Sequence, residues 1–312
     1  MSKVVFGVDV GGTTVKLGCF NTEGELLDKW EIPTRTEDKG SNIIGDIAGS
    51  ILVKLAKDDI DKKDVVGIGI GVPGPVKSDG TVIVAVNLGW KDVNVNSELE
   101  ELTGIKVKTS NDANVAALGE MWRGGGQGYS NVVAVTLGTG VGGGIIVDGK
   151  IVNGATGAGG EIGHIHLEDN ETEACGCKGH GCLEQYASAT GVVRLAKKKL
   201  ADSSKDSVLR EGEVTAKDVW DAVKAGDELA IEVAHIYGEY LGKGLAAVAD
   251  VVNPEVFVIG GGVSRAGRVV IEYMEPYFDK YVFPGAKGAK FALAKLGNDA
   301  GIYGAAFLVL DK

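Results

Sequence analysis

The sequence predicts an α/β fold built from two similar halves. The N-terminal segment has a short apolar run at 4–8, a glycine-rich turn and a second strand-like run at 15–20. The same order returns in mid-chain, where an apolar run at 131–137 precedes the glycine-rich stretch 138–144 and another strand at 145–147. Elsewhere strand and helix patterns alternate, as is typical of α/β domains. One supersecondary unit therefore occurs twice.

The other elements follow from hydrophobic periodicity and from capping patterns. Further strands are expected over 65–72, 81–86, 105–109 and 256–259. Helices are expected over 42–55, 112–122, 183–200, 215–225, 228–252 and 300–310. The sequence Ser-Glu-Leu-Glu from Ser97 matches a capping box and predicts that a short helix opens there. A domain boundary is expected near 111–123, because no linker or low-complexity segment marks another place.

The composition is that of a globular protein with room for two domains. The chain has 312 residues, of which 44% are hydrophobic, and a domain typically has about 150 residues. The net charge of -11 argues against non-specific binding to nucleic acid, which needs a basic surface. No signal-peptide pattern opens the chain, and no apolar run reaches the length of a membrane span. We expect a cytoplasmic protein that binds neither nucleic acid nor membrane.

The first glycine-rich turn has the residue types of a phosphate-binding loop. Glycines let backbone N–H groups approach phosphate oxygens, and hydroxyl and ammonium groups add donors. Asp9 is an acid inside an otherwise apolar strand, and a bound Mg²⁺ would offset the cost of burying it. A plain hairpin in which Asp9 caps the turn remains an alternative. The candidate nucleotide-binding residues here are Asp9, Gly11, Gly12, Thr13, Thr14 and Lys16.

Two further glycine-rich loops strengthen the case for a nucleotide. The stretch 137–144 has five glycines, and its candidate binding residues are Gly138, Thr139 and Gly140. Gly260, Gly261 and Gly262 follow the predicted strand 256–259, and the carboxyl ends of strands are where α/β sheets bind ligands. Three such loops, two of them in a repeated context, indicate one nucleotide held between two halves.

Acidic residues next to predicted elements are candidates for acid–base chemistry. Asp112 lies between a strand and a helix, where it is either an N-cap or a general base that takes the proton of an attacking hydroxyl. Glu161 and His164 follow the glycine-rich run 154–160 and have the chemistry to bind vicinal hydroxyls. Glu184 faces the same pocket or serves as an acid in the first turn of a helix.

Three cysteines within eight residues indicate a metal site. Cys175, Cys177 and Cys182 cluster, and with one histidine they form the ligand set of a closed, structural zinc site. His164, His166 and His180 all compete for the fourth position on spacing alone. The zinc would hold the nearby loop rigid.

Taken together, these motifs resemble those of the bacterial-type glucokinases of the ROK family (repressor, open reading frame, kinase). The resemblance covers the whole chain and rests most on Glu161-Ile162-Gly163-His164 and on the Cys-x-Cys-x4-Cys-x-Glu run that ends at Glu184. It implies an actin-like, hexokinase-type (ribonuclease H-like) fold with two lobes. The small lobe would comprise 1–111 and a C-terminal helix at about 299–312, and the large lobe 112–298.

The resemblance also implies residue roles and ligands. Asp112 would be the base for the sugar 6-hydroxyl, and His164 would join the three cysteines as zinc ligand. ATP would bind with Mg²⁺, for which Asp9 is the candidate partner. Lys178 departs from the family pattern, which has glycine there, so the loop conformation is expected to differ locally. The sugar contacts would be Asn87, Asn111, Asp112, Glu161, His164 and Glu184.

The expected activity is phosphorylation of glucose by ATP. Segments 71–75 and 87–90 resemble the glucokinase versions of the sugar-side loops. N-acetylmannosamine, fructose and mannose are the alternative sugars, and a homodimer or homotetramer is the expected assembly. A sugar-responsive repressor is disfavoured, because the first glycine loop starts within ten residues of Met1 and leaves no room for a DNA-binding module. A binding-only protein is disfavoured because Asp112 is present.

Overall fold

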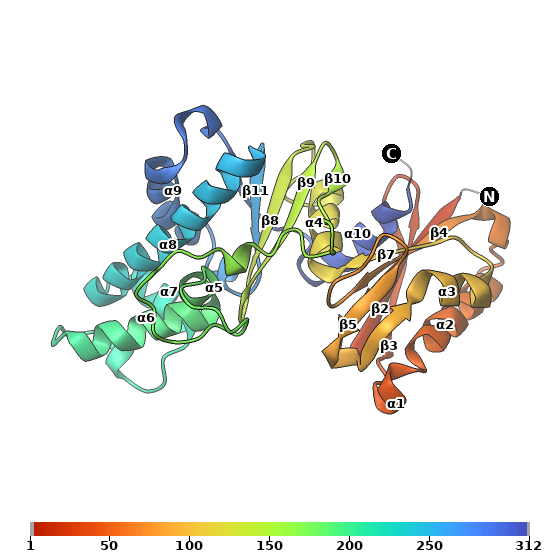
Figure 1. The fold of residues 1–312 in the computed structure, drawn as a ribbon, viewed down its shortest axis with the longest axis horizontal. Helices are drawn as coiled ribbons and strands as arrows, with labels where there is room; N and C mark the ends of the chain where they lie inside the picture. The colour runs from red at the N-terminus through yellow and green to blue at the C-terminus, as the bar shows by residue number, and fades with distance from the viewer. Residues whose placement is uncertain (1–2, 311–312) are drawn as a thin grey trace. The chain divides into compact units, whose positions relative to one another are not determined.

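The computed structural model describes residues 3–310 and divides into two compact units (Figure 1). Unit 1 comprises the chain up to Gly128, the segment Gly144–Gly160 and the chain from Lys295. Unit 2 comprises Tyr129–Gly143 and Glu161–Ala294. Residues 1–2 and 311–312, which the expected small lobe includes, lie outside the described residues. Within 3–310, no helix has both the length and the apolar character to cross a membrane.

A five-stranded mixed sheet forms the centre of unit 1, with the order β3-β2-β1-β4-β7. Strands β1, β2 and β3 pair as an antiparallel meander, whereas β1, β4 and β7 are parallel. The expected strand at 65–72 is confirmed with its bounds. The strands are β1 (Val4–Val10), β2 (Thr14–Asn21), β3 (Leu26–Pro33), β4 (Val65–Val72) and β7 (Val107–Asn111).

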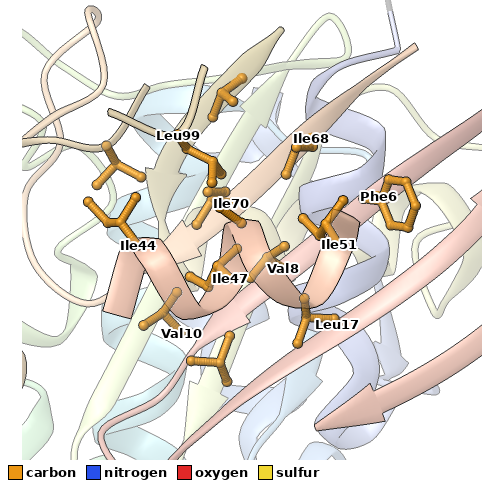
Figure 2. Close-up of a cluster of buried hydrophobic side chains, with 14 of the residues drawn as sticks. Phe6, Val8, Val10, Leu17, Ile44, Ile47, Ile51, Ile68, Ile70 and Leu99 are labelled. Carbon is orange, nitrogen blue, oxygen red and sulfur yellow. The ribbon is translucent and has the colours of Figure 1, made fainter. Parts of the chain in front are cut away.

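One face of this sheet packs on α2 (Ile43–Lys57) and α3 (Val95–Thr103). Ile44, Ile47 and Ile51 form the helical stripe of α2, and Figure 2 shows them facing the side chains of β1 and β4. Spacings of three and four residues put these side chains on one face of the helix. The short helix α1 (Glu37–Gly40) precedes α2, and the hairpin β5 (Thr81–Ala85) and β6 (Trp90–Asn94) precedes α3.

The opposite face of the sheet packs on α10 (Ala300–Leu308), and α10 packs on α4 (Asp112–Arg123). The helix lies very close to the strands, because a Cβ built on Gly7 would be 1.9 Å from the carbonyl oxygen of Ile302. Helix α10 therefore belongs to the same unit as β1.

The second sheet repeats the topology of the first. Its order is β10-β9-β8-β11-β12, so that a meander again adjoins a parallel set. The division between the units falls within β9. The internal repeat predicted from the sequence is thus present. The strands are β8 (Val132–Leu137), β9 (Val141–Val147), β10 (Lys150–Ile151), β11 (Val256–Gly260) and β12 (Lys290–Leu293).

Unit 2 contains five of the ten α-helices in the described residues. The long helix α8 has the bounds that the sequence predicts, and α7 starts behind a capping box at Thr215. Trp220 of α7 and Tyr237 of α8 are fully buried and meet edge to face. The helices are α5 (Glu184–Ala187), α6 (Ala189–Asp202), α7 (Ala216–Ala225), α8 (Glu228–Val252) and α9 (Val269–Tyr281).

Three local predictions were wrong. The helix expected over 183–200 is two helices, because Ser188 is extended and its side chain caps α6 through the N–H of Gly191. The capping box at Ser97 is not formed, since α3 begins at Val95 and its cap is Asn94, which accepts from the N–H of Ser97. The second glycine loop is also shorter than expected, because β9 already begins at Val141.

Candidate active site

The carboxyl edge of the first sheet brings two acidic positions together. Asp9 of β1 pairs in register with Gly71 of β4, and Gly71 pairs with Ser110 of β7. Asn111 and Asp112 follow directly at the end of β7. The parallel strands therefore place Asp9 and Asp112 at one edge, where α/β sheets bind ligands.

The loop between β1 and β2 leaves backbone donors unused. The N–H of Gly11 donates to the carbonyl of Thr14 (3.0 Å). Thr34 makes two bonds to the loop: its hydroxyl donates to the carbonyl of Gly11 (2.7 Å), and its N–H donates to the carbonyl of Thr13 (2.9 Å). None of these bonds uses the N–H of Gly12 or Thr13, and both residues are exposed. Such a loop has the form of an anion-binding concavity.

Asp9 is half-buried and strongly perturbed. Burial raises the pKa of its carboxyl group to about 6, the charge of Lys16 opposes this rise, and the charge of Asp112 adds to it. The carboxylate packs on the first turn of α10, because a Cβ on Gly301 would be 2.6 Å from Asp9 Oδ2. A half-buried carboxylate beside exposed hydroxyls offers the oxygen donors that Mg²⁺ prefers, so the residues fit this ion.

Lys16 is oriented by the chain that leads into α10. Its Nζ donates to the carbonyl of Asn298 (3.1 Å), and it lies directly across the β1–β2 ladder from Asp9. The positive charge of Lys16 therefore lies beside the loop between β1 and β2.

Asp112 does not cap its helix. The cap of α4 is Asn111, whose side-chain oxygen accepts from the N–H groups of Ala113 (3.0 Å) and Asn114 (3.3 Å) and whose Nδ2 donates to the carbonyl of Gly74 (3.1 Å). Asp112 is accessible to solvent, yet surrounding protein atoms desolvate its carboxyl group and raise its pKa. A raised pKa and an exposed carboxylate are what a general base requires.

Asn87 adjoins the first loop. It lies in a single 3-10 turn, Val86–Leu88, and is exposed. A Cβ built on Gly12 would be 3.8 Å from the Cβ of Asn87. Unit 1 thus gathers the first loop, Asn87, Asn111 and Asp112 on one side.

In unit 2, the loop Gly138–Gly140 has the same character as the first loop. Two of its carbonyls already accept hydrogen bonds. The N–H of Ala189 donates to the carbonyl of Gly138, and the hydroxyl of Thr190 donates to the carbonyl of Thr139, both at 2.8 Å. The N–H of Gly138 donates to the carbonyl of Gly140 (3.0 Å). No bond of this loop uses the N–H of Thr139 or Gly140, which leaves both for an anion.

The third loop adjoins the second. Gly261 has a φ of +83°, and a Cβ there would be 2.6 Å from backbone atoms of Leu137. Only glycine combines this left-handed conformation with so close an approach. Gly261 therefore lies beside Leu137, at the start of the Gly138–Gly140 loop, and Gly260 pairs in register with Thr136 of β8.

The cysteine cluster has the ligand types and the spacing of a metal site. One ligand atom from each of His164, Cys175, Cys177 and Cys182 lies within 4.8 Å of all the others. Zinc–sulfur bonds of about 2.3 Å in a tetrahedron put two sulfurs about 3.8 Å apart, and Cys177 Sγ and Cys182 Sγ are 3.7 Å apart. These residues fit zinc.

The structure also distinguishes the three candidate histidines. Both ring nitrogens of His166 face other acceptors, since Nε2 lies 2.8 Å from Asp169 Oδ1 and Nδ1 lies 2.8 Å from the carbonyl oxygen of His180. Only His164 joins the group of four among the described residues. Lys178 has a left-handed φ of +71°, a conformation that favours glycine.

The sugar-side acids of unit 2 lie near the second loop. Glu161 precedes the 3-10 turn Ile162–His164, which packs on β9 because a Cβ on Gly163 would be 2.1 Å from the carbonyl of Val141. Glu184 Oε2 accepts from the N–H of Val141 (3.0 Å). A cavity of about 360 Å³ opens beside Glu184. Its lining includes Thr139, Gly140, Glu173, Cys175, Glu184 and Arg194.

Comparison with known proteins identifies the family. Residues 5–312 match the ROK family. The chain belongs to the ROK family. It is 45% identical to a glucokinase of Halalkalibacterium halodurans over 309 residues, which are 97% of this chain and 94% of the relative.

Solved structures of ROK proteins confirm the fold class. The ROK hexokinase from Thermus thermophilus is similar with a TM-score of 0.81 and 31% identity, covering 98% of this chain and 97% of its own. A ROK family glucokinase from Streptomyces griseus, in complex with glucose and AMPPNP, is similar with a TM-score of 0.71 and 34% identity over 98% of both chains. The predicted actin-like, hexokinase-type fold is therefore correct.

Sequence reasoning missed the residues that hold the ROK site in shape. Thr34 and Thr190 fix the carbonyls of the first and second loops, and Asn298 orients Lys16. Each is more than 20 residues from its partner along the chain. The only local signal was at Ser188-Ala189-Thr190, where cap-forming residues interrupt the apolar pattern.

Proposed function

We propose that the protein transfers the γ-phosphoryl group of ATP to glucose and so forms glucose 6-phosphate. The observation that carries this proposal is the near full-length similarity to a glucokinase at 45% identity and to a glucokinase structure that holds glucose and AMPPNP. The site geometry agrees with it, because phosphoryl transfer needs anchored phosphates, a charge-neutralising cation and one proton acceptor.

The phosphates are assigned to the two repeated loops. The unused N–H groups of Gly12 and Thr13, and those of Thr139 and Gly140, are donors for phosphate oxygens. Lys16 adds a positive charge. Mg²⁺ would be held through Asp9 and would neutralise charge on the phosphates. Gly260–Gly262 would complete the nucleotide site.

Asp112 is assigned the proton transfer. A carboxylate with a raised pKa accepts a proton more readily than an ordinary aspartate, because the charged form is less favoured. Asn111 fixes the backbone turn that contains Asp112, because its side-chain oxygen accepts from the N–H groups of Ala113 and Asn114. The position of Asp112 is therefore set before the sugar binds. The proton of the sugar 6-hydroxyl would pass to Asp112 as the oxygen attacks the γ-phosphorus, and the bond from this phosphorus to the β–γ bridging oxygen would break, so that ADP leaves.

The sugar hydroxyls are assigned to the polar residues that the family resemblance implies. Carboxylates and amides accept and donate to vicinal hydroxyls, and a buried polar group without its partner hydroxyl is costly, which produces specificity. Zinc at the cysteine cluster would hold the segment from His164 to Cys182 rigid. It would take no part in phosphoryl transfer, because its four ligands leave no open position. The sugar-binding residues would be Asn87, Asn111, Glu161, His164 and Glu184.

A substrate panel tests the proposal. ADP release is measured with ATP and Mg²⁺ for glucose, mannose, fructose, N-acetylmannosamine and N-acetylglucosamine. We expect the highest kcat/KM with glucose. No turnover with glucose, together with efficient turnover of another sugar, would reject glucose as the substrate while leaving the kinase assignment intact. No ADP release above the sugar-free rate with any sugar would reject the kinase.

A homodimer or homotetramer, as implied by the family resemblance, is part of the same proposal. Light scattering of the purified protein distinguishes these assemblies from a monomer of 32.3 kDa.

A further inference from the structure

Glu184 makes two protein contacts with one carboxylate. It is the first residue of α5 and is half-buried. Its Oε2 accepts from the N–H of Val141 at 3.0 Å, and its Oε1 lies 3.4 Å from Cys175 Sγ. The side chain thus joins the loop that carries the cysteine cluster to the loop Gly138–Gly140.

The contact with Val141 is a close one. A Cβ built on Gly140 would be 2.0 Å from Glu184 Oε2, so that the carboxylate lies directly on the Gly140–Val141 peptide. Val141 is the first residue of β9, so this bond lies where the loop Gly138–Gly140 passes into the strand. The carboxylate oxygen is a charged acceptor, and such hydrogen bonds are about twice as strong as neutral ones.

Glu184 completes a set of anchors around this loop. Ala189 and Thr190 hold the carbonyls of Gly138 and Thr139, whereas Glu184 holds an N–H. The N–H groups left free are those of Thr139 and Gly140. Because Gly140 has no Cβ, its peptide can rotate unless the following N–H is fixed. Glu184 is the only side chain described that accepts from that N–H.

We propose that Glu184 is a positioning residue for the phosphate loop. It aims the N–H groups of Thr139 and Gly140 at the nucleotide, and it does so before any sugar is bound. This role rests on the proposed function, since it assumes that Gly138–Gly140 binds nucleotide. It adds to the sugar contact assigned to Glu184, and it makes nucleotide affinity depend on a residue in contact with the cysteine cluster.

Nucleotide binding in the absence of sugar tests this role. Calorimetry with AMPPNP and Mg²⁺ is carried out on the full-length wild type, Glu184→Ala, Glu184→Asp and Glu184→Gln. We expect about tenfold weaker binding for Glu184→Ala and Glu184→Asp, because both lose the bond to Val141. Glu184→Gln keeps an acceptor within reach of Val141 and should stay within about threefold of the wild type.

The matched control is Glu173→Gln. Glu173 lines the same cavity, and its carboxylate pairs with Arg194 at 3.3 Å. This control removes the same charge as Glu184→Gln but no contact with the loop. We expect its nucleotide affinity to equal that of the wild type. A loss in Glu173→Gln as large as in Glu184→Ala would mean that charge, and not the contact, sets affinity, and would overturn the proposal.

Amide hydrogen exchange gives a readout that needs no ligand. The N–H of Val141 should exchange faster in Glu184→Ala than in the wild type, while neighbouring amides of β8 keep their protection. Unchanged exchange, or wild-type AMPPNP affinity in Glu184→Ala, would overturn the positioning role and leave the kinase assignment standing. Failure of the wild type itself to bind AMPPNP would instead overturn the proposed function, and this role with it.

Discussion

The carbonyl oxygen of Ala305 lies 1.6 Å from the point where a Cβ on Gly69 would stand. Helix α10 can therefore approach β4 only because residue 69 is a glycine. The same helix carries Gly301, which packs on the carboxylate of Asp9. The close approach at Gly69 thus determines where one wall of the candidate site lies.

Gly69→Ala is expected to destabilise the protein by several kcal/mol. The added methyl group meets backbone atoms, which cannot move aside without shifting α10, and overpacking of this kind typically costs about 1–3 kcal/mol or more. Urea unfolding measures the change. Gly45→Ala is the control, because Gly45 is exposed in α2 with nothing within 4 Å of its Cβ position. The control should gain up to about 1 kcal/mol from helix propensity. Equal stability of Gly69→Ala and the wild type would contradict the packing.

Asp112→Asn is expected to abolish turnover and to preserve sugar binding. Asparagine keeps the shape of the side chain but accepts no proton, and loss of a general base typically costs about 10²–10⁴-fold in rate. A coupled ADP assay gives kcat, and calorimetry with glucose gives the affinity. The acid limb of the wild-type kcat/KM profile should shift above the usual aspartate range, because the pKa of Asp112 is raised. Near-wild-type turnover in the variant would show that another group takes the proton.

Several elements could be predicted because their signal is local. The strand Val65–Val72 and the helix Glu228–Val252 have continuous apolar patterns with clear ends, and both were found with their bounds. Helix α9 was missed because Pro276 lies inside it and interrupts the pattern. Strand β3 was missed because most of its residues are exposed and three of them, Asp28, Lys29 and Glu31, are charged.

The sequence names the candidate site residues, but not the residues that support them. Glycine loops and the cysteine spacing are visible in the sequence, since their chemistry needs those residue types close together. The bond from Thr190 to Thr139 and the bond from Lys16 to Asn298 join residues far apart in the chain. Only the folded chain reveals such partners, because periodicity does not encode which distant side chain meets a given carbonyl.

Asp9→Asn is expected to stabilise the ligand-free protein at neutral and basic pH. The folded pKa of about 6 is above the ordinary value of 3.8. Asp9 therefore favours the folded state fully below pH 3.8, and this contribution is lost as the pH rises through 6. A shift of this size corresponds to at most about 3 kcal/mol.

Thermal unfolding across the pH range checks this prediction. The melting temperature of Asp9→Asn should exceed that of the wild type at pH 8, and the difference should shrink towards pH 4.5. AMPPNP affinity in the presence of Mg²⁺ should fall in the same variant. A melting difference that grew as the pH fell would show that Asp9 is stabilised as a carboxylate, contrary to the raised pKa.

Cys177→Ser is expected to remove a bound zinc ion and to lower thermal stability. Cys177 is exposed, so that the substitution opens no cavity in the core and any loss reflects the metal. Metal analysis should find about one zinc per chain in the wild type and less in the variant. A chelator should lower the wild-type melting temperature to that of the variant. A wild type without zinc and with the same melting temperature as Cys177→Ser would contradict the site.

Lys178→Gly is expected to stabilise the loop between Cys177 and Cys182 without loss of metal. Lys178 has a φ of +71°, and its N–H donates to the carbonyl of Cys175 at 2.8 Å. Glycine adopts this left-handed conformation without the steric cost that a side chain with a Cβ incurs, which is about 1 kcal/mol. The turn that orients the sulfurs would be kept, because the N–H remains. Thermal unfolding of the zinc-loaded variant should therefore show a small rise in melting temperature at unchanged zinc content. A fall in melting temperature would mean that the lysine side chain itself supports the loop.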